Sequence, residues 1–211
     1  EYFSLGYVPD PHCIYEGFSK LQAGHTLTLN LDSNEPPQIN QYWHCLNYFS
    51  PSKQNPDDIV REGKELLGDS INRHMVADVP VGAFLSGGMD SSAITAMMTQ
   101  SGKVQTYSVG FDVNQYDESI EAESAADIFD TNHTGLTVSY NTFEYLDELV
   151  NMFDEPFADN STIPIFAVSN LASKEVKVVL SGDGADELFL GYRNYRLLNF
   201  ENKLKRLFPR P

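Results

Sequence analysis

The sequence predicts an α/β fold in which a parallel sheet carries helices on both faces, preceded by a short β segment. From Val79 onward, short apolar segments alternate with segments of helical periodicity, which is the pattern of a parallel sheet with crossover helices. Three of these apolar segments end in glycine, serine or acidic residues. In open α/β sheets, ligands bind beyond the carboxyl ends of the strands, so these endings are candidate site residues.

Residues 1–44 have β character. The segment His25–Leu31 alternates apolar and polar residues with period 2, as a half-buried strand does. Turn residues follow at Asp32–Pro37, and "QINQYWH" can return as the partner strand. The polar stretch Asn47–Asp58 contains two prolines and is typical of a linker. Asp57 or Asp58 is predicted to cap a helix that runs to about His74.

The rest of the chain is predicted to alternate strands and helices. The helix that begins at residue 91 is expected to end at Gly102, and Pro164 is tolerated in the first turn of its helix. The predicted strands are residues 81–85, 104–111, 133–139 and 176–181; the predicted helices are residues 91–100, 117–129, 142–153, 163–175 and one long helix from about Ala185.

Composition narrows the classes of partner. Of the 211 residues, 41% are hydrophobic, as in an ordinary globular protein, and 14 basic residues face 30 acidic ones for a net charge of −16. Such a charge repels nucleic-acid phosphates and anionic membranes, so we expect neither a nucleic-acid nor a membrane partner.

Cys13 and Cys45 have no metal or redox spacing, which favours a reducing, cytoplasmic location. The ends, without an initiator Met, suggest a fragment of a larger protein or a chain trimmed at both ends.

The loop "SGGMDSS" (Ser86–Ser92) has the character of an anion cradle. Gly87 and Gly88 lack Cβ atoms, so backbone N–H groups can approach an anion, and the following helix N-terminus adds partial positive charge. A carboxylate at Asp90 would repel phosphate unless it holds Mg²⁺ that bridges to the phosphates. The loop is neither a Walker A sequence nor a dinucleotide fingerprint. The alternative is an ordinary glycine-containing turn.

The loop "SGDGADE" (Ser181–Glu187) repeats this chemistry after another apolar strand. Asp183, Asp186 and Glu187 place three acids within five residues, more than a helix start needs unless a cation or basic ligand is present. Asp186 and Asp90 could share one metal ion. The alternative is a capped, solvated helix start, but two Ser-Gly-acid loops after two strands make coincidence a poor explanation.

Other candidate sites carry weaker signals. The polar stretch Asp154–Thr162 could line a substrate pocket or form an ordinary loop. The segment Asp112–Ser119 lacks the glycine of a calcium loop and is rejected as one. Arg193 and Arg196 could meet phosphates or pair with nearby acids. The five histidines, which show no ligand spacing and are interpreted as structural, are His12, His25, His44, His74 and His133.

Together the ordered motifs resemble a known family. "LSGGMDSS" resembles the PP-loop of the ATP pyrophosphatases, an adenine nucleotide alpha hydrolase-like fold. "DVPVGAFLSGGMDSSAI", "TYSVGFD", "DEPFADNSTIP" and "VVLSGDGADELFLGY", in this order, resemble the synthetase domain of class B glutamine-hydrolysing asparagine synthetases. The upstream segment "YVPDPHCIYEGFSKLQAGHTLTLNL" with "QYWH" resembles the end of that family's N-terminal nucleophile-type glutaminase domain. The resemblance covers nearly the whole chain.

The resemblance implies a domain organisation and a reaction. Residues 1–46 would be the C-terminal remnant of a type 2 glutamine amidotransferase domain, 47–56 a linker, and 57–211 a C-terminally truncated ATP-binding domain. The reaction would be asparagine synthesis from aspartate, ATP and glutamine-derived ammonia. A β-aspartyl-AMP intermediate would form, with release of pyrophosphate and then AMP. The implied cofactors are ATP and Mg²⁺, and a homodimer of the full-length protein is compatible with the family.

The same resemblance assigns roles to individual residues. Pyrophosphate and Mg²⁺ would be bound by Ser86, Gly87, Gly88, Asp90 and Ser91, and the adenine nucleotide by Leu85, Val109, Ser181 and Gly182. Asp186 would join Asp90 as the second metal carboxylate and, with Asp183, is a candidate catalytic residue. Asp183 stands where well-known members have Glu, one methylene longer, which leaves its role open.

Two departures from the family pattern affect the expected activity. The chain begins with Glu1 where the family's glutaminase has a cysteine nucleophile, so glutamine hydrolysis is not expected. The C-terminal part that carries a family lysine also lies outside the sequence. We therefore expect this chain alone to make little or no asparagine. Two alternatives remain: a related amidotransferase acting on a β-lactam, peptide or glycan carboxylate, and a non-catalytic nucleotide-binding homologue.

Overall fold

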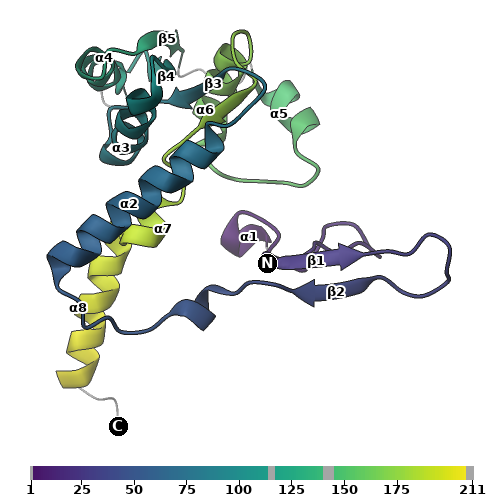
Figure 1. Cartoon of the computed structure of the whole chain (residues 1–211). Helices are drawn as coiled ribbons and strands as arrows, with labels where there is room; N and C mark the ends of the chain where they lie inside the picture. The colour runs from purple at the N-terminus through teal and green to yellow at the C-terminus, as the bar shows by residue number, and fades with distance from the viewer. Residues whose placement is uncertain (1, 114–116, 140–144, 208–211) are drawn as a thin grey trace. The chain divides into compact units, whose positions relative to one another are not determined.

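The structure, a computed structural model, describes residues 2–113, 117–139 and 145–207, and it divides into two compact units (Figure 1). Unit 1 comprises Glu1–Glu62 and Asn141–Ile163. Unit 2 comprises Gly63–Tyr140 and Pro164–Pro211. Each unit is therefore built from two separate stretches of the chain.

Unit 1 is a loop-rich unit around one antiparallel hairpin. Its elements are α1 (Tyr2–Leu5), β1 (His25–Thr28), β2 (Gln38–Gln41), η1 (Cys45–Tyr48) and α5 (Leu146–Met152). Strands β1 and β2 pair from His25 opposite Gln41 to Thr28 opposite Gln38, which confirms the predicted hairpin. Within the described part of this unit, Leu149 is the only buried hydrophobic side chain.

Helix α2 (Pro56–His74) begins in unit 1 and continues into unit 2. It ends where the sequence predicted, but the predicted cap was wrong. The side-chain oxygen of Asn55 accepts a hydrogen bond from the backbone N–H of Asp57 at 3.1 Å, so Asn55 caps the helix. Asp57 and Asp58 lie in the first turn, where their charges favour the positive end of the helix dipole.

Unit 2 is built on a four-stranded parallel sheet with the order β5-β4-β3-β6. The strands are β3 (Val81–Phe84), β4 (Gln105–Phe111), β5 (Asn132–Val138) and β6 (Val178–Leu180). Ala83 of β3 pairs with Leu180 of β6 on one side and with Thr106 of β4 on the other. The three strands whose ends were predicted to carry the site are therefore neighbours. The predicted α/β fold with a parallel sheet is confirmed.

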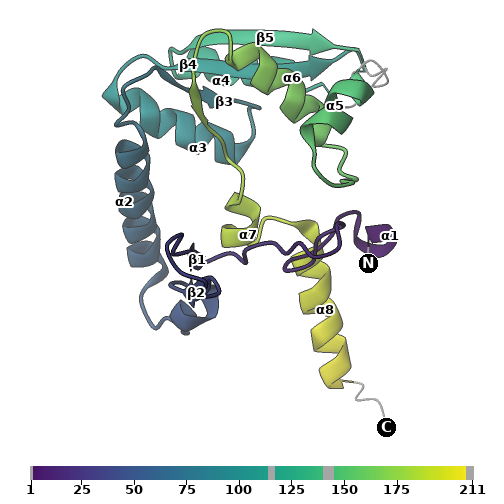
Figure 2. The same ribbon diagram turned by 90° about the vertical axis from the view of Figure 1, so that its right-hand side faces the viewer.

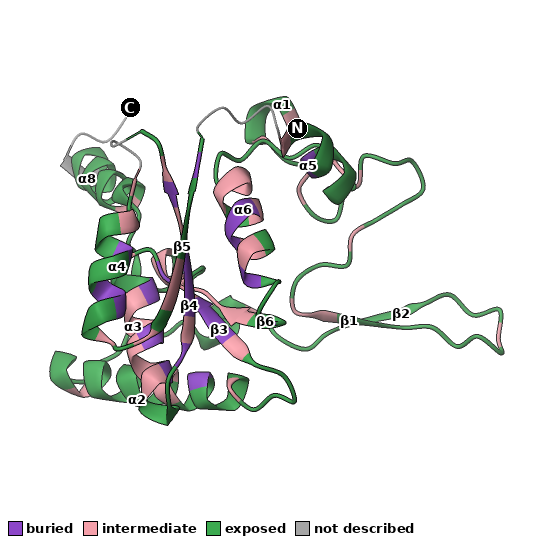
Figure 3. Ribbon diagram, turned by 90° about the horizontal axis from the view of Figure 1, so that it is seen from above, coloured by how far each residue is buried: buried purple, intermediate pink, exposed green. Residues whose placement is uncertain are grey.

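Helices cover both faces of this sheet, and Figure 3 shows α6 on one side with α3 and α4 on the other. The helices are α3 (Met89–Met98), continued by η2 (Thr99–Ser101), α4 (Ser119–Ile128) and α6 (Thr162–Ala172). Successive strand residues point to opposite faces. Tyr107 accordingly packs against Val168 of α6. Leu85, just after β3, packs against Ala125 of α4 on the other face. The core thus comprises two apolar layers, one on each side of the sheet.

The predicted long helix after residue 185 was wrong, because it is two helices, α7 (Ala185–Phe189) and α8 (Arg193–Leu207) (Figure 2). Leu190 has a left-handed conformation with a φ of 58°, and the N–H of Gly191 donates to the carbonyl oxygen of Asp186 at 3.0 Å. This left-handed residue ends α7. In the described residues, no helix is both long and apolar enough to cross a membrane.

Candidate nucleotide-binding site

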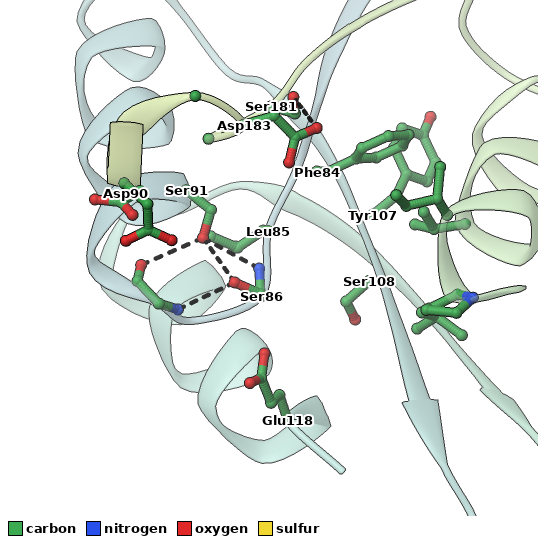
Figure 4. Close-up of a pocket in the computed structure, with 18 of the residues that line it drawn as sticks. Phe84, Leu85, Ser86, Asp90, Ser91, Tyr107, Ser108, Glu118, Ser181 and Asp183 are labelled. Carbon is green, nitrogen blue, oxygen red and sulfur yellow. Dashed lines mark hydrogen bonds between the residues drawn. The ribbon is translucent and has the colours of Figure 1, made fainter. Parts of the chain in front are cut away.

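A cavity of about 540 Å³ lies at the carboxyl edge of the sheet in unit 2, a size common for sites that bind small molecules. Residues of β4, the end of β3 and the segments that follow β3, β4 and β6 line it, together with residues of α3, α6 and α7 (Figure 4). Its lining residues are Phe84, Leu85, Ser86, Gly88, Asp90, Ser91, Tyr107, Ser108, Val109, Phe111, Glu118, Pro164, Ile165, Val168, Ser181, Gly182, Asp183, Gly184, Asp186, Glu187 and Tyr192.

The loop after β3 is shaped by its own serines. Ser91 Oγ donates to the carbonyl oxygen of Gly88 at 3.2 Å and accepts from the backbone N–H of Ser86 at 3.2 Å. The two hydroxyl oxygens, Ser86 Oγ and Ser91 Oγ, lie 3.0 Å apart, and Ser86 Oγ also accepts from the N–H of Gly88 at 3.2 Å. Gly88, the N-cap of α3, has no side chain to cap the helix. The first N–H groups of α3 therefore remain available to an anion.

Gly87 lets this loop pass against the neighbouring helix. Its φ is +77°, and an added Cβ would come within 2.5 Å of the carbonyl carbon of Glu121 in α4. Both the left-handed backbone and the missing side chain are thus required here. Of the predicted binding residues, Gly87 is the one that does not line the cavity.

The loop after β6 meets the loop after β3 through a second glycine. A Cβ on Gly182 would lie 2.9 Å from the backbone nitrogen of Ser91 and 3.1 Å from Cβ of Asp90, so Gly182 packs directly on the first turn of α3. In the same loop, Ser181 Oγ donates to Asp183 Oδ2 at 2.9 Å. The two Ser-Gly-acid loops, nearly a hundred residues apart in sequence, are therefore adjacent in space.

Except for Gly87, all the predicted site residues lie at this one cavity. Those that line the cavity are Leu85, Ser86, Gly88, Asp90, Ser91, Val109, Ser181, Gly182, Asp183 and Asp186. Placement at one cavity is a geometric result, and the individual roles of these residues stay predictions.

The cavity is strongly acidic. Five carboxylates line it, and no lysine, arginine or histidine is among its lining residues; the acids are Asp90, Glu118, Asp183, Asp186 and Glu187. Phosphate groups would be repelled by these charges unless a cation accompanied them. No group of three or more His, Cys, Asp or Glu side chains among the described residues is arranged to hold a metal ion. Mg²⁺ is usually bound by one or two carboxylates together with substrate phosphates. Asp90 and Asp186 could supply these two carboxylates.

Several lining residues were missed from the sequence. Tyr107 and Ser108 belong to β4, and Pro164 and Ile165 belong to the first turn of α6. Their contribution depends on which strand neighbours which and on how α6 crosses the sheet, neither of which periodicity specifies. One available signal was Ser108, a hydroxyl residue in the otherwise mainly apolar segment "YSVGF".

Two tyrosines at the cavity donate hydrogen bonds to glutamates. Tyr107 is fully buried, and its hydroxyl donates to Glu175 Oε2 at 3.1 Å. Burial and this hydrogen bond raise the pKa of Tyr107 to about 12. Tyr192 donates to Glu187 Oε1 at 2.7 Å, which raises the pKa of Tyr192 to about 12. Both phenols therefore remain protonated at neutral pH.

The polar stretch 154–162 contributes to a different cavity. Asp154, Glu155 and Phe157 line a cavity of about 870 Å³ in unit 1, together with residues from the first twenty of the chain. Glu155 Oε2 pairs with Lys20 Nζ at 2.8 Å, and this hydrogen bond is the main cause that lowers the pKa of Glu155. Residues 154–157 of this stretch thus line a cavity, and the substrate pocket stays a prediction.

Comparison with known proteins places the chain in a family. The sequence profile described as asparagine synthase matches residues 62–210, which include all the strands of the parallel sheet and every residue of the acidic cavity. The chain belongs to the asparagine synthase family.

Individual relatives agree with this placement. The chain is 41% identical over 198 residues to a putative glutamine-hydrolysing asparagine synthetase 2 of Methanocaldococcus jannaschii, covering 92% of this chain and 38% of the relative. It is 36% identical over 200 residues to the glutamine-hydrolysing asparagine synthetase 1 of Bacillus subtilis, covering 93% of this chain and 31% of the relative. The chain thus spans only about a third of the length of these relatives.

Among solved structures, the chain is similar to an NH3-dependent NAD synthetase from Campylobacter jejuni. The TM-score is 0.42 and the sequence identity 16%, over 63% of this chain and 60% of that one.

Proposed function

We propose that this chain is the ATP-binding part of an enzyme that forms an amide from a carboxylate, with aspartate as the carboxylate and asparagine as the product. A carboxylate oxygen of aspartate attacks the α-phosphorus of ATP, and the bond to pyrophosphate breaks. Ammonia derived from glutamine then attacks the carbonyl carbon of β-aspartyl-AMP, AMP leaves, and a proton is released. Family membership and the names of the relatives support this proposal.

The single observation that carries the proposal is the meeting of an anion-binding helix start with an acidic loop. The uncapped N-terminus of α3 can hold phosphate oxygens, while Asp90 and Asp186 line the same cavity. Mg²⁺ bound by these two carboxylates would neutralise phosphate charge. The chain's own groups bind and orient the nucleotide, so that catalysis by this part rests on positioning and charge stabilisation.

The proposal also covers the domains of the protein, its substrates and the position of Asp183. Residues 1–46 would be the end of a glutaminase domain, 47–56 a linker and 57–211 the ATP-binding domain of a cytoplasmic enzyme. The small-molecule substrates would be aspartate and ammonia. Asp183, hydrogen-bonded to Ser181, would lie beside the reacting carboxylate.

The test is exchange of labelled pyrophosphate into ATP by the complete protein that carries this chain. We expect exchange that depends on aspartate and on Mg²⁺, and that drops at least a hundredfold in Asp90→Ala, since one electrostatic group in such sites contributes about 10²–10³ in rate. The surface variant Asp69→Ala is the control. Exchange with another carboxylate but not with aspartate would replace the proposed substrate. Absence of exchange with every carboxylate would refute the proposed reaction.

A further inference from the structure

A chain of hydrogen bonds runs from α4 through β4 and β5 to the acidic cavity. Thr131 Oγ1 donates to the carbonyl oxygen of Ala126 at 3.5 Å and lies 2.8 Å from Thr106 Oγ1. Thr106 Oγ1 lies 3.0 Å from His133 Nδ1. His133 Nε2 lies 3.1 Å from Ser108 Oγ. Ser108, the last member, is 5% exposed and lines the cavity (Figure 4).

The carbonyl oxygen of Ala126 sets one of the two possible directions of these hydrogen bonds. In that direction the single proton of the Thr131 hydroxyl goes to Ala126, because a carbonyl oxygen can only accept. Thr131 Oγ1 then accepts the proton of Thr106, and Thr106 Oγ1 accepts from His133 Nδ1–H, whereas the opposite direction would put the ring proton on Nε2. In a neutral imidazole the other nitrogen is then an acceptor, so His133 Nε2 accepts the proton of Ser108.

The surroundings of His133 favour the neutral ring that this argument requires. Burial lowers the pKa of His133 below its ordinary value of 6.5, against the opposing effect of Glu123 and Asp127 in α4. At neutral pH the imidazole therefore has one proton, on Nδ1 in this arrangement, and Nε2 keeps its lone pair.

We propose that His133 fixes the Ser108 hydroxyl as a hydrogen-bond acceptor that selects a donor group of the bound nucleotide, a specificity determinant of the ATP site. The proposal rests on the nucleotide-binding function proposed above. Among the described residues, Ser108 Oγ has no other hydrogen-bond partner, so its lone pairs can accept from a ligand. A purine 6-amino group or a ribose hydroxyl offers that donor, whereas a 6-oxo group does not.

The experiment measures equilibrium binding of four nucleotides with Mg²⁺ to the 211-residue chain by calorimetry. The ligands are ATP, ITP with a 6-oxo group, 2′-deoxy-ATP and 3′-deoxy-ATP. The chain should bind at least one analogue about fivefold or more weakly than ATP, the size of one neutral hydrogen bond. Ser108→Ala should bind ATP about fivefold more weakly and lose discrimination against that analogue alone. The identity of that analogue shows whether the donor is the base or the ribose.

One further variant tests whether His133 positions the Ser108 hydroxyl, and two control variants test for a general loss of structure. In His133→Phe, Ser108 is retained but its hydroxyl proton is no longer held by the imidazole. This variant should therefore lose the discrimination against the same nucleotide analogue as Ser108→Ala. Ser124→Ala and His74→Gln, whose exposed side chains bond to backbone carbonyls of their own helices, should bind all four nucleotides like the parent chain. Unchanged discrimination in Ser108→Ala, with ATP still bound, would overturn this inference and leave the proposed function standing. Absence of nucleotide binding by both the 211-residue chain and the complete protein that carries it would refute both.

The tautomer of His133 gives a readout that does not depend on ligand binding. Imidazole ¹⁵N spectra of the chain, assigned with His133→Phe, should show a protonated Nδ1 and an unprotonated Nε2 at neutral pH. A protonated Nε2 would donate to Ser108, free the serine proton to face the cavity, and so contradict the proposal.

Discussion

At the residue scale, two glycines decide how closely the two site loops approach the neighbouring helices α4 and α3. Gly87 has a positive φ and packs against the backbone of α4, and Gly182 packs against the first turn of α3. A side chain at either position would have to displace backbone, which a well-packed interior resists.

Gly87→Ala should therefore damage both stability and binding. The substitution combines about 1 kcal/mol of backbone strain with an overpacking cost of about 1–3 kcal/mol. We expect a loss of about 2–4 kcal/mol in the free energy of unfolding, measured in urea, and a Kd for ATP raised at least tenfold. Gly17→Ala is the matched control, because Gly17 has a φ of +83° and open space around it, so it should lose only the strain. Equal losses in both variants would contradict the close approach to α4.

The site could be predicted in part because its chemistry is concentrated in two short loops. Glycines and acids after apolar strands identified Asp90 and Asp186 directly. Ser108 and His133 escaped notice because their meeting depends on strand register, which places Thr106 opposite His133. His133 was interpreted as structural from its isolation in sequence. The hydrogen bonds at both ring nitrogens agree with that interpretation, and one of them is made with Ser108, which lines the cavity.

At the scale of elements, the strands and helices of unit 2 follow the periodicity of the sequence closely. Apolar runs became the central strands, and Gly102 follows η2 as expected. The break between α7 and α8 was not predictable from helix propensity, because leucine is a strong helix former. Leu190 has a left-handed conformation that leucine seldom adopts, and the N–H of Gly191 donates to the carbonyl oxygen of Asp186 at this helix end.

Leu190→Gly should accordingly stabilise the chain. Leu190 is 63% exposed, so little packing is lost, while glycine relieves a left-handed strain of about 1 kcal/mol. We expect the free energy of unfolding to rise by about 0.5–1 kcal/mol. The control is Leu188→Gly in α7, 78% exposed, where glycine should lower that free energy by about 0.5–1 kcal/mol. Destabilisation by both substitutions would contradict the separation of α7 from α8.

At the scale of the whole molecule, the two units differ in how much core they contain. Nearly all buried hydrophobic residues lie in unit 2, whereas the described part of unit 1 buries Leu149 alone. Small units with so little buried apolar surface are marginally stable by themselves. Unit 2 contains the complete acidic cavity, so nucleotide binding is expected to depend on unit 2 rather than on the β1–β2 hairpin.

Backbone amide spectra of the ¹⁵N-labelled chain, recorded with and without ATP and Mg²⁺, test the central claim that nucleotide binds where the loops after β3 and β6 meet. The largest chemical-shift changes should fall on the amides of residues 86–91, 108–110 and 181–184. Those of residues 25–41 should remain unchanged, and ATP without Mg²⁺ should produce weaker changes at every concentration. Shifts centred on unit 1, or no shifts at saturating MgATP, would contradict the assignment of this cavity as the nucleotide site.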